Sequence, residues 1–438
     1  MSEGSDRERL HAVFRPPASE AIVEVPRSPY PSVRLVRLHL LAFVLALVVQ
    51  VVATVPMQGE LFDAAPTWPL RWYADAYLTH TFSLFTMVVP ALAGVLPLLL
   101  SLGEARVPTP WPRWLPVLAL AGWVGGMVCY AIALAISVPA LAGWGTAAIL
   151  LADLVYLLGA MLGVLAAGPG RAWRSLLVSA TTIAVVVNVA LFYVVEISPS
   201  LRPYLGSWSV GPTFAVAAPL LLAMLLASIE PRRLAVGARA APRWATAVVV
   251  LGMLLSPFAV GALALPVLVL VLLRAARPLL VGGAWTKEPA ALAKLLALVT
   301  VVLGAGPASL LGTLSVDVHL HDTYFVVALD HVVAATLLLL LLGSAYERST
   351  ALLGRVPHRG LAIASVVGIG GGFGLGIVAM LALGQAGMPQ RYPAYVPELE
   401  PLHRAVGAGG LLVAVGLLLV GLALATGRRD PIPSTHSS

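Results

Sequence analysis

The sequence predicts an all-α polytopic membrane protein with about twelve transmembrane helices. Of the 438 residues, 59% are hydrophobic and only 11% are charged, and the mean hydropathy is +0.93. Apolar runs long enough to cross a bilayer, which takes about 20 residues, recur along most of the chain. Basic residues gather in alternate loops, as they do in multi-spanning proteins. These three observations exclude a soluble domain with a large core.

Ten uninterrupted apolar runs have spanning length. An eleventh stretch, 243–273, is interrupted by Pro257 and Pro266 and has basic segments on both sides. Because basic loops mark one side of the membrane, an even number of crossings must fall inside it. We therefore expect a helical hairpin there, which raises the total to twelve. The ten runs cover residues 35–56, 76–102, 114–140, 145–168, 173–196, 209–229, 289–315, 324–346, 360–384 and 404–427.

The loop charges predict that both termini lie on the cytoplasmic side of a bacterial-type inner membrane. Residues 1–34 form a cytoplasmic tail, 35–427 a single transmembrane domain, and 428–438 a second cytoplasmic tail. The net charge of +7 then belongs to membrane-flanking loops and indicates no nucleic-acid partner. The single Cys129 excludes a disulfide framework or a cysteine-pair metal site.

Two of the nine histidines, His80 and His331, lie clearly inside predicted membrane segments. Their segments begin near Ala76 and Tyr324, both on the outer side, so the two imidazoles should lie roughly 6–10 Å below the same surface. Two neutral imidazoles at matching depth on separate helices can hold a haem iron between them. The alternative is two core histidines, each hydrogen-bonded to a backbone carbonyl.

The polar stretch from 317 to 331 joins two of the apolar runs and carries six ionisable side chains. Such groups are costly at or inside a membrane, so each is a candidate functional residue. Those near the start could simply lie at the water interface, whereas Asp330 and His331 lie about 10 Å into the segment. The six are Asp317, His319, His321, Asp322, Asp330 and His331.

Three segments resemble subunit I of the haem-copper oxidases. Residues 321–328, His-Asp-Thr-Tyr-Phe-Val-Val-Ala, resemble the His-Asp-Thr-Tyr-Tyr-Val-Val-Ala-His-Phe-His signature of that family. Residues 384–395 resemble its Gly-Met-Pro-Arg-Arg-Tyr-Pro-Asp-Tyr loop, and residues 80–108 its second helix. The resemblance implies one low-spin haem. Its ligands would be His80 and His331, and its propionates would be ordered by Arg391, Asp317, His321 and Asp322.

The departures from the family pattern bear on function. Leu329 stands where the family has its high-spin haem ligand, and no histidine lies between His80 and His319 to supply a copper site. The resemblance therefore implies no copper and no oxygen-reducing centre in this chain. The family arginine that faces the formyl group of haem A falls at Gln58, which favours haem B.

We therefore expect a subunit I-like protein that relays electrons in a respiratory complex with other membrane subunits. The alternative is a haem-free structural scaffold subunit of a membrane complex. A transporter that uses Asp330 and Asp153 is disfavoured, because no pair of broken helices appears in matching halves of the chain. For Asp330, protonation, an ion pair with Arg391 or Arg404, and occupation of the space of the missing haem all stay open.

Overall fold

A computed structural model of the chain describes a set of mostly helical segments. Two elements are two-residue strands, β1 (Arg355–Val356) and β2 (Arg428–Arg429), and the other elements are helices. This agrees with the all-helical class that composition and hydropathy predict. The described residues are 33–60, 80, 114–136, 141, 144–145, 147–149, 151–152, 155, 273, 276–277, 279–311, 319–320, 322–390 and 395–429.

Six long helices correspond to six of the predicted apolar runs. They are α2 (Val33–Glu60), α5 (Leu115–Ile136), α13 (Pro289–Leu311), α15 (Tyr324–Glu347), α17 (Arg359–Gln385) and α18 (Glu400–Ala425). Short helical turns complete the described part: η5 (Val281–Gly283), α12 (Ala284–Lys287), α16 (Ser349–Leu353) and η6 (Pro397–Leu399).

Three helical segments among the described residues are long and apolar enough to cross a membrane: Tyr324–Glu347, Arg359–Gln385 and Pro397–Ala425. Leu115–Cys129 and Pro289–Gly304 are shorter apolar helices. The other predicted runs, including the 243–273 hairpin, lie wholly or mostly outside the described residues. The total of twelve helices therefore stays a prediction.

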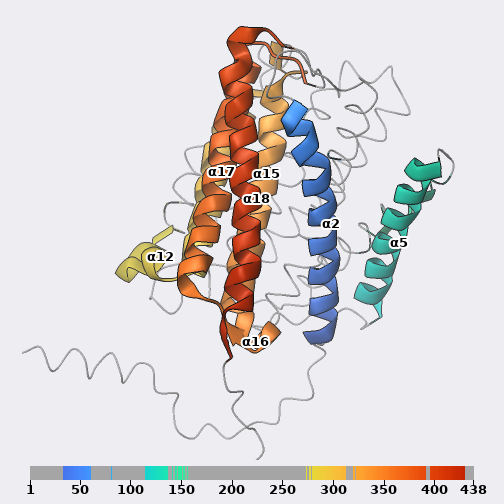
Figure 1. The fold of residues 1–438 in the computed structure, drawn as a ribbon, viewed down its shortest axis with the longest axis vertical. Helices are drawn as coiled ribbons and strands as arrows, with labels where there is room; N and C mark the ends of the chain where they lie inside the picture. The colour runs from blue at the N-terminus through green and yellow to red at the C-terminus, as the bar shows by residue number, and fades with distance from the viewer. Residues whose placement is uncertain are drawn as a thin grey trace, which may run out of the picture.

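Helices α13, α15, α17 and α18 form the central bundle, and α2 lies along α18 (Figure 1). The most extensive helix pair among the described elements is α17–α18, where glycines bring the backbones together. A Cβ atom added to Gly409 would collide with the carbonyl oxygen of Gly372, and one added to Gly416 would collide with Ile369. Small residues at such interfaces allow close helix packing in membranes.

Polar contacts tie one end of the bundle. Lys294 on α13 donates to Glu347 at the end of α15 at 2.7 Å, and Arg348 donates to the same carboxylate at 2.8 Å. Arg37 near the start of α2 donates to the carbonyl of Leu352 at 2.6 Å. Strands β1 and β2 pair antiparallel, which brings the loop before α17 to the segment after α18. Two predicted basic loops therefore lie at the same end, as the loop-charge argument requires.

The opposite end joins two segments that resemble the family's motifs. Thr323 caps α15 by accepting from the Phe325 N–H, which is the usual role of threonine at this position. The Tyr324 N–H donates to the Met388 carbonyl at 3.1 Å, and the Gln390 N–H donates to the Asp322 carbonyl at 2.9 Å. The turn between α17 and this contact contains Gly387 at φ 78°, in the left-handed region that favours glycine.

Candidate functional site

His331 lies on α15, two helical turns from the Thr323 cap. Its Nδ1 lies 2.8 Å from the Val327 carbonyl oxygen, one turn earlier in the same helix. A carbonyl oxygen only accepts hydrogen bonds, so the neutral ring carries its proton on Nδ1 and its lone pair on Nε2. The local helix geometry therefore orients the ring and leaves Nε2 available as a ligand.

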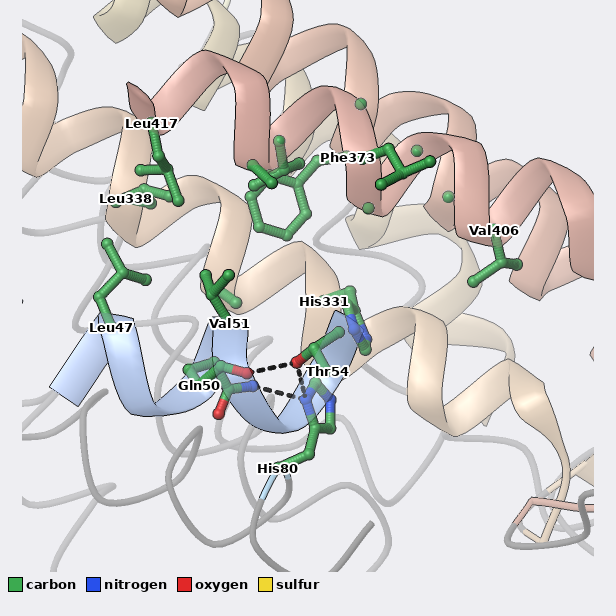
Figure 2. Close-up of a pocket in the computed structure, with 18 of the residues that line it drawn as sticks. Leu47, Gln50, Val51, Thr54, His80, His331, Leu338, Phe373, Val406 and Leu417 are labelled. Atoms are coloured by element: carbon green, nitrogen blue, oxygen red, sulfur yellow. Dashed lines mark hydrogen bonds between the residues drawn. The ribbon is translucent and has the colours of Figure 1, made fainter. Parts of the chain in front are cut away.

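Two side chains of α2 hold His80. Thr54 Oγ1 and Gln50 Nε2 each lie 2.7 Å from His80 Nδ1 (Figure 2). The Thr54 hydroxyl donates to the backbone carbonyl of Gln50 at 2.6 Å. Because the threonine proton is used inside α2, its oxygen accepts from an Nδ1–H on His80. As placed, the Gln50 amide nitrogen would donate to Nδ1, but an amide turned by 180° presents its oxygen in the same place and accepts from the Nδ1–H. His80 then also carries its lone pair on Nε2.

The two imidazoles face each other across the bundle. Their centroids lie 5.8 Å apart with an interplanar angle of 23°, and only 8% of the His80 surface is exposed. Metal–imidazole bonds of about 2 Å on either side of one metal ion, with about 1 Å more to each ring centre, give about 6 Å between centroids. The centroid spacing therefore matches that of two histidines that would hold one metal ion between them.

A cavity of about 350 Å³ opens beside the histidine pair. It lies between α2, α15, α17 and α18 (Figure 2). The polar side chains of its wall are those of His80, His331, Gln50 and Thr54, and the rest of the lining is apolar. This volume lies in the range of cofactor and ligand sites, which are mostly apolar with a few placed polar groups.

Glycines form much of the cavity wall from α17 and α18. Gly372, Gly376, Gly407, Gly409 and Gly410 all line it. A Cβ atom added to Gly410 would meet nothing within 4 Å, so that position faces open space. Glycine there keeps the wall flat, and any larger side chain would enter the cavity. A flat wall would accommodate a planar macrocycle such as haem. The two histidines are donors that suit its iron.

The other predicted site residues are only partly described. Asp322 is exposed at the start of α15, beside the loop 386–390. Asp317, His321 and Arg391 lie outside the described residues, so their roles stay predictions. Leu329 is buried and packs with Phe325 on a different side of α15 from the His331 cavity. The side chain of Gln58 also lies outside the described part.

The proposed ion pair of Asp330 stays open. The structure pairs Arg404 with Glu400, one turn earlier in α18. The other suggested partner, Arg391, lies outside the described residues. Asp330 itself is half-buried on α15, next to His331 in sequence.

Sequence reasoning missed Gln50 and Thr54. A usable signal was present, because two polar residues four apart on one face of an otherwise apolar helix are costly in a membrane and call for a partner. It also missed His403, which is 1% exposed, stacks on Tyr395 and meets Tyr324 edge-on. Among the described residues, neither ring nitrogen of His403 has a hydrogen-bond partner.

Comparisons with known proteins agree with this fold. Residues 240–412 match the family model described as Cytochrome C and Quinol oxidase polypeptide I. The chain is 32% identical over 134 residues to cytochrome c oxidase polypeptide 1 of Halobacterium salinarum and 33% identical over 118 residues to cytochrome c oxidase subunit 1 of Thermostichus vulcanus. These matches cover 30% and 27% of this chain, but only 22% and 21% of the two relatives.

The fold resembles that of a heme-copper terminal oxidase dimer solved by cryo-EM. The TM-score is 0.64 at 14% identity, over 90% of this chain and 84% of the other. The molecule is thus a helical membrane protein with an oxidase-type fold. More particularly, residues 240–412, which contain the motifs at 321–328 and 384–395, are similar to subunit I of the haem-copper oxidases.

Proposed function

We propose that this protein binds one low-spin haem between His80 and His331 and relays electrons within a respiratory membrane complex. The observation that carries the proposal is the adjacent histidine pair, in which each Nδ1 is within hydrogen-bond distance of another group, so that each Nε2 would be the ligand. When bound, the haem would supply one-electron redox chemistry. With both histidines holding the iron, no position would be left open for a substrate, which would suit electron transfer.

In this proposal the residues around the site orient the two imidazoles and exclude water from the cavity. Val327 and the Gln50–Thr54 pair fix the two imidazoles, since partners of this kind set the tautomer and the basicity of a ligating histidine. The leucine, valine and phenylalanine side chains of the cavity keep water away from the site and so set its polarity. Gln58 stands where the family has the arginine that faces the formyl group of haem A, and an amide carries no charge, which favours haem B in this proposal.

Leu329 is the observation that separates this proposal from an oxygen-reducing role. It stands at the position of the family's high-spin haem ligand, and a leucine side chain binds no metal. We therefore propose that oxygen reduction, where the complex performs it, belongs to another subunit. That the protein works with other membrane subunits of an electron-transfer complex rests on the family resemblance and is part of the same proposal.

A reduced-minus-oxidised spectrum of the purified full-length protein tests this function. We expect one haem per chain by pyridine haemochrome, sharp low-spin bands, and no change on addition of carbon monoxide. In the His331→Ala variant the low-spin bands should be lost. In the matched His319→Ala variant, whose exposed imidazole lies on the outer side of the same segment, they should remain.

Two results would contradict the proposal. A folded preparation without haem would favour the haem-free scaffold. A band that shifts with carbon monoxide would show an open iron position, which the opposed histidines do not provide.

A further inference from the structure

The β1–β2 ribbon concentrates positive charge at one end of the bundle. Arg355 lies directly opposite Arg429, and Val356 lies opposite Arg428. Like charges at facing strand positions repel each other. Within the described residues, acidic side chains form ion pairs with Lys294, Arg348 and Arg404. None of those ion pairs involves an arginine of the ribbon. The ribbon therefore lacks an acidic partner in the part of the chain that the structure describes.

The arginines lie at the depth where the apolar part of α18 ends. The helix runs to Ala425, and Arg428 follows three residues later. Arg355 Nη1 donates to the Ala425 carbonyl at 2.7 Å, which fixes that guanidinium at the helix end. In a bilayer, the polar headgroup layer begins where the hydrocarbon ends. The ribbon is thus at the level of lipid phosphates, on the side that carries the basic loops.

An exposed apolar stripe on α18 leads directly to these arginines. Leu411, Val415, Leu418 and Leu422 are spaced by four, three and four residues, so they share one face of the helix. Leu418 is 70% exposed, and the other three are each exposed by about half. Leu411 also lines the cavity, whereas Val415, Leu418 and Leu422 lie outside the cavity lining. The stripe offers acyl-chain contact in line with the cationic ribbon.

We propose that this end of α17 and α18 binds an anionic phospholipid. Arg355, Arg428 and Arg429 bind the phosphate, and the acyl chains lie on the stripe from Leu411 to Leu422. Basic groups at helix ends on this side of a membrane bind anionic headgroups. The cationic ribbon and the apolar stripe lie next to each other. A phospholipid contacts both, whereas a free anion or an acidic protein segment contacts only the ribbon. The site does not depend on haem at His80 and His331.

Thermal unfolding of the full-length protein in detergent, at rising concentrations of added lipid, tests the proposal. Dioleoyl phosphatidylglycerol should raise the unfolding temperature at lower concentration than dioleoyl phosphatidylcholine, and inorganic phosphate should have little effect. The R428Q/R429Q variant should need about thirty-fold more phosphatidylglycerol, because each cation near an anionic lipid surface raises affinity by about five-fold. The R277Q/K287Q variant removes the same charge from exposed positions before α13 and should respond like the parent protein.

The choice of variants separates binding from folding. Arg428 and Arg429 make no side-chain hydrogen bond within the described residues, so their glutamine variants should fold without lipid. Should R428Q/R429Q nevertheless unfold, R428K/R429K keeps the charge, and a lipid response like that of the parent would support the site. Equal responses to the two lipids would overturn the proposal. So would a phosphate effect as large as the lipid effect, or equal losses in R428Q/R429Q and R277Q/K287Q.

Discussion

The hydroxyl oxygen of Thr54 lies 2.7 Å from Nδ1 of His80, while its proton is donated to the Gln50 carbonyl inside α2. Threonine often bonds back to a carbonyl one turn earlier, and in isolation that bond has no partner outside its own helix. Here the same oxygen has a second role, because its lone pair faces the imidazole. One residue thereby links the backbone of α2 to the orientation of a candidate iron ligand.

Thr54→Val should weaken haem binding about 10- to 100-fold, the usual effect of removing a group that orients a metal ligand. Without the acceptor, Nδ1–H loses electron donation to the ring, the ligand becomes less basic, and the reduction potential should rise. Haem titration and redox potentiometry measure the two effects. Thr300→Val is the matched control, since Thr300 makes the same bond to Leu296 but lies away from the histidines. An unchanged potential in Thr54→Val would contradict the role of the hydroxyl.

Gly410→Leu should exclude a cofactor from the cavity without disturbing helix packing. The position lines the cavity and faces open space, so the new side chain enters the volume that the macrocycle needs. We expect haem content to fall tenfold or more, since overpacking of this kind costs about 1–3 kcal/mol. Gly421→Leu is the control, because Gly421 also has open space around it but lies outside the cavity wall. Equal haem content in both variants would show that the cofactor does not occupy this cavity.

Gly409→Ala should destabilise the α17–α18 pair by roughly 1–3 kcal/mol. Its methyl group would collide with the carbonyl of Gly372 and with the backbone of Gly376, and neither can move aside like a flexible side chain. Gly410→Ala, one residue later, adds the same methyl group in open space and should be neutral or slightly stabilising. Unfolding in a denaturing detergent series compares the two variants. Similar midpoints for both would show that the close approach of these helices contributes little to stability.

Glu347→Gln should destabilise the basic end of the bundle by roughly 3 kcal/mol, because it leaves the buried Lys294 ammonium without the carboxylate to which it donates. The partial exposure of Glu347, 35%, places the expected effect at the low end of the range for buried pairs. Lys294→Met should cost less, since Arg348 still binds Glu347.

The double variant K294M/E347Q completes a thermodynamic cycle for this ion pair. It should recover much of the loss seen in Glu347→Gln, because the Lys294 ammonium is then removed and Arg348 is the one buried cation of this pair of contacts that loses the carboxylate. Unfolding midpoints of the four proteins provide the measurement. Strict additivity of the two single effects would show that the ion pair is not coupled.

The positions of several helices could be read from the sequence because membrane helices are set by local composition. The run predicted at 324–346 is observed as Tyr324–Glu347, and that at 360–384 as Arg359–Gln385. The run predicted from 404 begins earlier, at Glu400. The charged residues there resembled a loop, but Pro401 suits the first helical turn, and Glu400 and Arg404 form an ion pair one turn apart.

The sequence by itself determined the class of the protein and indicated two histidines at matching depth, whose ring centroids the structure places 5.8 Å apart. Hydropathy, loop charge and the 321–331 motif depend on residues near one another along the chain, so they are visible without a fold. Only the tertiary structure decided what surrounds the histidines. Gln50 and Thr54 reach His80 because of the rotation and depth of α2, and the glycines of α17 and α18 open the cavity because those helices meet there. Such contacts depend on how separate helices pack, which no local pattern records.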